Sequence, residues 1–179
     1  MLVRYNMIKF GNKVVTYNNK WAKYDSAPPG PSLPPFTIRL KYAQGTTPTF
    51  SKGTGVLYDA EQNIWDLTYE NPDWTDLLRG HADLIEVIEA NTSNVTNMSN
   101  MFANCTSLIN VPLFDTSKVT NMNRTFYSCR NVQSGALALY QQASTQANPP
   151  SNHSWTFRHC GSATETGTAE LAQIPSNWK

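Results

Sequence analysis

At 179 residues, the chain is long enough for one domain, or for one domain with a small appendage. Its net charge of +1 and its 15% of charged residues give no electrostatic basis for binding nucleic acid or an anionic membrane, and no apolar run approaches the length of a membrane span. The five Trp, eight Tyr and seven Phe residues can supply a folded core, so we expect a folded protein with no nucleic-acid partner and no membrane span.

Residues 1–26 predict a small β-hairpin. The stretch "MIKFGNKVVTY" alternates around Gly11-Asn12, a dipeptide typical of two-residue hairpin turns. Because an isolated hairpin is marginally stable in water, we expect it to dock on a protein partner as an attachment peg. The N-terminus, "MLVRYNMIKFGNKVVTYNNKW", lacks the apolar core and cleavage site of a signal peptide, so we expect no export signal unless the sequence continues upstream of Met1.

Residues 27–35 hold five Pro and predict an extended, semi-rigid spacer. Residues 36–70 then predict a β cap for the region that follows. In "FTIRLKY", the alternation places Phe36, Ile38, Leu40 and Tyr42 on one face of a strand, and further strands are expected over 56–58 and 64–69. Such a cap would cover the apolar end of a repeat array.

Residues 71–179 contain a repeat with a spacing of 24 positions. Val95, Met98, Phe102 and Cys105 recur as Val119, Met122, Phe126 and Cys129. A degenerate copy precedes these two, and "TFRHC" at 156–160 follows "TFYSC" at 125–129 after a longer interval. The inserted residues 136–147 predict a helix with Ser134 as its N-cap, stopped by the Pro pair at 149–150.

A 24-residue period is typical of leucine-rich repeats. We therefore expect a helical or 3-10 arm over 98–104, a turn, and a short strand over 108–114 in each repeat. The expected fold is α+β: a short leucine-rich-repeat-like solenoid capped by the N-terminal β region. The predicted repeat core comprises Val95, Met98, Phe102, Cys105, Leu108, Val119, Met122, Phe126, Cys129, Phe157 and Cys160.

The segments "NTSNVTNMSNMFANCTSL" and "DTSKVTNMNRTFYSC" resemble the BspA-like repeats of bacterial surface proteins, because Asp, Thr, Ser, Val, Met, Phe and Cys recur in that order at fixed offsets. The resemblance covers about residues 71–179, with two good copies and two degenerate ones. It implies a leucine-rich-repeat solenoid used for extracellular binding or adhesion, with no catalytic residues and no cofactor. Members are usually long arrays with export signals, and this chain departs from them in both respects.

The strand face of the repeats is the surface that we expect to bind a partner. If Leu108, Val111 and Leu113 point inward, the residues between them face solvent and form an apolar patch across two repeats. Glu89 falls at an inward position in this frame, which indicates a shift in the first repeat. The alternative is that another element covers this face. The predicted binding residues are Ile85, Glu86, Ile88, Ile109, Asn110, Pro112 and Phe114.

The three cysteines, Cys105, Cys129 and Cys160, occupy one repeat position. We expect a file of buried thiols there, because free Cys is among the most buried residue types. A disulfide and a metal site are the alternatives; the close ligand pairs of zinc sites are absent from the sequence, so no metal is assigned.

Three histidines and five carboxylates are candidate catalytic groups. His81, His153 and His159 accompany no catalytic motif, so structural or surface roles are expected for them. A glycosidase uses a pair of carboxylates, but the sequence spacing does not show that any two of the acidic residues lie close together. We therefore expect them on solvated faces or as turn caps. The acidic residues concerned are Asp59, Glu61, Asp66, Glu86 and Glu89.

These observations predict a non-enzymatic structural and interaction protein. By analogy, the first hypothesis is a bacteriophage virion component, such as a head fibre, decoration or tail protein, because virion proteins need no signal peptide to reach a surface. Its hairpin would grip a capsid or tail protein, and its repeats would bind a host surface protein or glycan. A bacterial cell-surface adhesin or secreted interaction module is the alternative, and a carbohydrate-active enzyme is the third hypothesis. Each of these hypotheses allows a homo-oligomer, and the sequence does not decide the oligomeric state.

Overall fold

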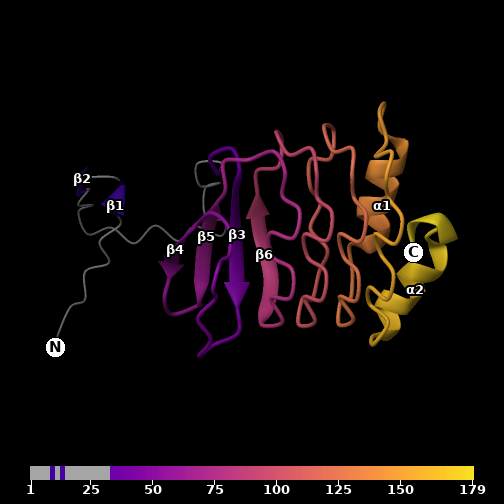
Figure 1. The fold of residues 1–179 in the computed structure, drawn as a ribbon. Coiled ribbons are helices and arrows are strands. Elements are labelled where there is room, and N and C mark those ends of the chain that lie inside the picture. The colour runs from indigo at the N-terminus through magenta and orange to yellow at the C-terminus, as the bar shows by residue number, and fades with distance from the viewer. Residues whose placement is uncertain (1–8, 11–12, 15–32) are drawn as a thin grey trace, which may run out of the picture. The chain divides into compact units, whose positions relative to one another are not determined.

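The computed structural model describes residues 9–10, 13–14 and 33–179 (Figure 1). The chain forms two compact units, Met1–Pro31 and Ser32–Lys179. In the first unit, β1 (Lys9–Phe10) and β2 (Lys13–Val14) pair antiparallel on either side of residues 11–12, where the sequence predicts a hairpin turn. The rest of the hairpin prediction over 1–26, and the spacer prediction over 27–32, lie outside the described residues.

Four antiparallel strands form a sheet at one end of the second unit. They are β3 (Thr37–Tyr42), β4 (Thr54–Asp59), β5 (Ile64–Thr68) and β6 (Leu84–Ala90), in the order β4-β5-β3-β6. The strands expected over 36–42, 56–58 and 64–69 correspond to β3, β4 and β5. On β3, the period of two buries Ile38, Leu40 and Tyr42, each at most 3% exposed, against the core.

Two bulges decide how β6 faces the core. The inward residues of β3 lie two positions apart, whereas their partners on β6, Leu84, Val87 and Ala90, lie three apart. Register shifts at Arg39/Leu40 and Lys41/Tyr42 place one extra β6 residue in each interval. Glu89 is therefore exposed, and its Oε1 accepts a hydrogen bond from the Leu33 amide at 3.3 Å.

Beyond β6, each copy of the repeat forms a series of tight turns, and successive copies lie side by side. We call each copy a row. Within one row, the Met101 amide donates to the Met98 carbonyl at 3.1 Å, while the next amide, of Phe102, donates to Thr125 O of the following row at 2.9 Å. Asn100 and Asn104 take left-handed backbone conformations, with φ of 53° and 64°. Left-handed residues cannot continue a right-handed helix, so the helical arm expected over 98–104 is wrong.

The predicted leucine-rich-repeat solenoid is also wrong. The unit is a small antiparallel four-stranded sheet with two short helices, α1 (Ala136–Thr145) and α2 (Glu165–Gln173), and a final 3-10 turn, η1 (Ser176–Trp178). Residues 108–114 form no strand and are joined to the next row by one isolated bridge, Asn110 to Ser134. Pro112 contributes to this outcome, because it has no amide hydrogen to continue a ladder.

The helices close the other end of the unit (Figure 1). The helix expected over 136–147 is confirmed as α1, but Gly135 (φ 93°) is its N-cap, and Ser134 instead donates to Asn110 Oδ1 at 2.8 Å. The amides of Gly135 and Leu137 donate to the Glu170 carboxylate of α2, at 3.2 and 3.1 Å. An acidic group at a helix N-terminus is favourable, so α2 stabilises the start of α1. The helix α2 is not among the elements expected from the sequence.

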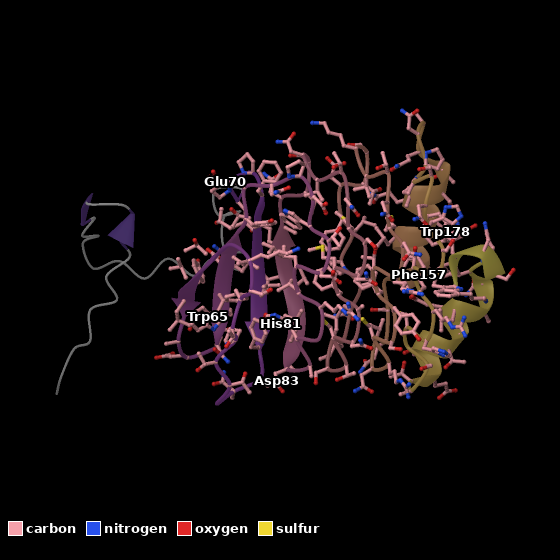
Figure 2. All side chains as sticks on the ribbon, in the orientation of Figure 1. Trp65, Glu70, His81, Asp83, Phe157 and Trp178 are labelled. Atoms are coloured by element: carbon pink, nitrogen blue, oxygen red, sulfur yellow. The ribbon has the colours of Figure 1, made fainter. Side chains whose placement is uncertain are left out.

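Aromatic rings form the centre of the core. Phe126 lies between Phe102 and Phe157, with ring centroids 5.1 and 6.0 Å apart and nearly parallel planes. Trp178 stacks on Phe157 at 6.2 Å and covers the end of this column, as the labels in Figure 2 show. Ladder bonds between rows thus hold the backbone, and the stacked rings hold the interior. No helix in the described part of the chain has the length and apolar character needed to cross a membrane.

Candidate interaction surface

The residues predicted to bind lie mostly on one outer surface, formed by β6 and the row that follows it. The two segments are neighbours, because the Ile109 amide donates to the Ile85 carbonyl at 3.0 Å. On the far side, the Gln133 amide donates to Ile109 O at 2.7 Å. We call this surface the β6 face, and it comprises Ile85, Glu86, Ile88, Ile109, Asn110, Pro112 and Leu113.

Two large apolar side chains protrude from the β6 face. Ile88 is 43% exposed and Leu113 is 66% exposed. Asn110 is exposed beside them, and Ile85, Glu86, Ile109 and Pro112 are half-buried. Apolar side chains on neighbouring rows, with polar groups among them, are typical of a surface that contacts another molecule.

Phe114 is not part of this surface. It is only 2% exposed, and its ring stacks on Phe102 with centroids 5.7 Å apart. The inward positions in this row are Leu108, Val111 and Phe114, three apart, so Leu113 faces solvent instead. A sequence signal for this frame existed: Leu113 lies 24 positions after Glu89, a charged residue whose place in the repeat marks an outward position.

The sheet beside the β6 face carries paired charges. Arg39 makes two bonds to the Asp66 carboxylate, at 2.7 and 2.8 Å, and the Tyr58 ring lies over its guanidinium at 3.7 Å. The hydrogen bond that Arg39 donates to Asp66 raises the pKa of Arg39. Lys41 lies opposite Glu86 in the ladder between β3 and β6. These groups give the apolar residues of β6 a polar border.

The three thiols are free and buried. The Cys105 thiol donates to Leu78 O at 3.1 Å, and the Cys129 thiol donates to Phe102 O at 3.0 Å. Burial raises the pKa of Cys129 to about 12 and raises the pKa values of Cys105 and Cys160 well above their ordinary value. A thiol that stays protonated is neither a nucleophile nor a metal ligand. Residues 33–179 hold no group of three or more His, Cys, Asp or Glu side chains arranged for a metal ion.

Each histidine has an aromatic neighbour. His81 Nδ1 lies 2.6 Å from Tyr42 Oη, and burial lowers the pKa of His81. His153 stacks on Trp178 with ring centroids 4.3 Å apart. His159 meets the edge of Tyr127 at 6.2 Å. In these contacts the rings pack against the fold, and none of them pairs with a Ser or Cys nucleophile.

Three of the five candidate carboxylates, Asp59, Asp66 and Glu89, make local structural contacts. Asp59 accepts hydrogen bonds from the amides of Glu61 and Gln62 at 2.9 and 3.0 Å, and the bond from Gln62 lowers the pKa of Asp59. Asp66 is bound to Arg39, and Glu89 accepts from the Leu33 amide. The carboxylate of Asp59 thus stabilises a turn, and that of Asp66 forms an ion pair. Both would have to break these bonds to act as a catalytic acid or base.

Two shallow hollows border the sheet. One, of about 230 Å³, lies beside His81 and Asp83, which Figure 2 labels near one end of the sheet, and is lined mainly by residues 46–49 and 80–83. The other, of about 410 Å³, lies at the start of β4, beside Tyr69 and Glu70. Ligand sites are usually enclosed and mostly apolar, so the protruding residues of the β6 face are the stronger candidate for binding.

The fold and this surface define a class of protein: an antiparallel sheet continued by stacked turn repeats, with an apolar outer face. Residues 64–149 match the family described as "Mycoplasma protein of unknown function, DUF285". That family is associated with BspA-like surface proteins, and the matched segment runs from the start of β5 past the end of α1. No curated protein and no solved structure matches the chain.

Proposed function

We propose that the chain is a non-enzymatic interaction protein and that the β6 face contacts its partner. The observation that carries this proposal is the exposure of Ile88 (43%) and Leu113 (66%) on two neighbouring rows of one face. Fully burying a side chain of this size is worth about 1.5–3 kcal/mol relative to leaving it exposed, so two such anchors can support specific binding.

We infer a bacterial or viral surface as the setting. The family match to residues 64–149 supports this, because that family is associated with BspA-like surface proteins. A bacteriophage virion component is the first choice, with a capsid or tail protein holding the N-terminal hairpin and a host surface protein or glycan on the β6 face. A bacterial adhesin or secreted module is the alternative, and the same family match supports it equally.

The setting is tested by locating the protein. Mass spectrometry of density-purified virions, compared with the envelope and culture-supernatant fractions of the same bacteria, separates the two settings. We expect the chain in the virion fraction at a fixed ratio to the capsid protein. Its absence from virions and its presence in the envelope fraction would overturn the virion setting and favour the adhesin.

The binding surface is tested by charge substitution. Fluorescently labelled chain is applied to intact cells of the bacterial strain that yields the virions, and bound label is counted by flow cytometry. Ile88→Lys and Leu113→Lys should each reduce binding about tenfold or more, because each removes an apolar anchor. Ala172→Lys, on the exposed side of α2, is the matched control and should bind like the unmodified chain. Equal binding by all variants would exclude the β6 face.

The non-enzymatic assignment is tested separately. Purified chain is incubated with bacterial cell-wall and capsular polysaccharides, and released reducing ends are measured. We expect none. Hydrolysis that disappears in Asp66→Asn, Glu86→Gln or Glu89→Gln variants would instead establish a carbohydrate-active enzyme.

A further inference from the structure

The β4 strand leaves one edge of the sheet open in the described part of the chain. β4 pairs with β5 on one side, and it is the terminal strand in the order β4-β5-β3-β6. The opposite end of the sheet is not open in the same way, because the row at Ile109 bonds to Ile85 of β6. Among the strands that the structure describes, each copy of the unit therefore has one edge without a paired strand.

The exposed edge is apolar. Val56, Leu57 and Tyr58 are 59%, 45% and 59% exposed, and they are three consecutive residues. Edge strands are usually protected by Lys, Pro, inward-pointing charges or bulges. The strand "TGVLYD" has neither Lys nor Pro, carries its single charge at the end, and has its bulge between Leu57 and Asp59, so residues 54–57 keep a regular edge. A regular apolar edge of this kind is suited to pairing with another strand.

We propose that β4 pairs antiparallel with β4 of a second copy of this chain, around a two-fold axis at Val56. The four strands of each copy would then form one continuous sheet across the dimer. This inference is independent of the proposed function, because it uses a different edge of the unit from the β6 face.

The side chains of β4 are complementary to themselves in this register. An axis at Val56 sets Tyr58 opposite Thr54 of the copy, and Leu57 opposite Gly55, so that a large residue faces a small one in each pair. Gly55 has the Phe50 ring directly beneath it, since a Cβ there would lie 2.3 Å from that ring. Leu57 of the copy would therefore pack on an aromatic surface.

A shift of the axis loses this complementarity. With the axis at Leu57, Tyr58 would face Val56, two large side chains together, and Asp59 would face Gly55 only two residues from the axis. With the axis at Val56, the two Asp59 carboxylates lie at opposite ends, about 20 Å apart along the strands. Each then lies near the start of the copy's strand, which Lys52 precedes by two residues.

The pairing also closes on itself. An antiparallel contact between identical strands is isologous, so each copy uses the same edge and none remains for a third copy. The expected assembly is thus a dimer and not a fibre.

A single cysteine tests the axis directly. In the proposed register, the two Val56 Cα atoms are opposite each other, about 4.5–5.5 Å apart, which is within the range of a disulfide. The full-length Val56→Cys chain should give a disulfide-linked dimer on a non-reducing gel after mild oxidation. Tyr58→Cys is the matched control, because the two substituted residues would lie about 13 Å apart along the strands and should not cross-link. The chain's own three cysteines are buried and should not react.

Analytical ultracentrifugation provides the second measurement. The unmodified chain should sediment as a dimer, and Leu57→Lys should shift it to monomer, with circular dichroism showing that the fold persists. Leu113→Lys, on the β6 face, should remain dimeric. A monomeric unmodified chain, equal cross-linking of the two cysteine variants, or a dimer lost only in Leu113→Lys would each overturn the proposal.

Discussion

The rings of Phe102 and Phe126 stack with centroids 5.1 Å apart and planes only 5° from parallel, although 24 positions separate them in the chain. Each ring occupies the same position in its row, so residues that lie 24 positions apart in the sequence are in contact in the core. This relationship explains why the chain repeats its apolar residues at a fixed interval. Offset stacking of aromatic rings adds to the free energy gained from burial.

The first prediction concerns Phe126, which contacts rings on both sides. Phe126→Ala should lower the free energy of unfolding by about 3–5 kcal/mol, because it opens a cavity between Phe102 and Phe157. Urea denaturation followed by tryptophan fluorescence measures the loss. Tyr127→Ala, at the adjacent half-buried position, should cost clearly less, and a similar cost for both would contradict a central role for the ring column.

The second prediction concerns the left-handed backbone positions. Asn104 and His159 occupy equivalent places in their rows, with φ of 64° and 58°. Asn tolerates this conformation better than other residues with a side chain. Asn104→Ala should therefore destabilise the protein by about 1 kcal/mol, and His159→Asn should stabilise it by about 0.5–1 kcal/mol. Thermal denaturation of both variants checks the opposite signs, and a destabilised His159→Asn would refute this account.

The third prediction concerns alkaline pH. The folded state raises the pKa of Cys129 from 9.0 to about 12, so its contribution to stability is complete below pH 9 and is lost as the pH rises above that value. The loss attributable to this thiol should approach about 1.4 kcal/mol per pH unit. Urea denaturation between pH 8 and about 10.5 measures it. Cys129→Ala should show a shallower decline, whereas identical slopes would mean that the thiol does not titrate on unfolding.

The fourth prediction concerns mildly acidic pH. Burial lowers the pKa of His81, so the neutral ring is favoured in the folded state, and its contribution is present above the ordinary value of 6.5 and lost as the pH falls below it. The slope should stay below about 1.4 kcal/mol per pH unit, because the ring is only partly buried.

His81→Gln provides the control for the acid prediction. Its amide oxygen can still accept a hydrogen bond from Tyr42, but it does not titrate. The variant should lose less stability than the unmodified protein between pH 6.5 and about 5, measured by thermal denaturation. Asp73 and Asp115 do not contribute to the change in stability over this pH range, because hydrogen bonds from Thr75 and Ser117 lower the pKa values of their carboxylates below 3.8.

The local sequence pattern was sufficient to predict several secondary-structure elements. The alternation in "FTIRLKY" predicted β3, and the helix-forming composition of 136–147 predicted α1, because both signals depend only on neighbouring residues. The 24-residue spacing placed Phe102 and Phe126, and likewise Cys105 and Cys129, at equivalent positions, and the structure stacks them in neighbouring rows.

Sequence pattern predicted only part of the candidate surface. Ile88 and Ile109 belong to it as expected from their positions, but Leu113 and Phe114 exchange places. The leucine-rich-repeat frame assumed a strand over 108–114 in which Leu108, Val111 and Leu113 point inward. Without that strand, the inward residues lie three apart, and nothing within the row itself reveals this.

The sequence by itself therefore determined the period, the sheet strands β3 to β5, the helix α1 and the residues that recur along the core. Only the tertiary structure decided that the rows are turns with left-handed residues, that β6 carries two bulges, and that Glu170 of α2 binds the start of α1. The reason is physical: over residues 98–105, alternate amides donate to the next row, so the conformation of this segment is set by acceptors 23 residues further along the chain. A local pattern cannot specify a backbone whose hydrogen bonds lie outside it.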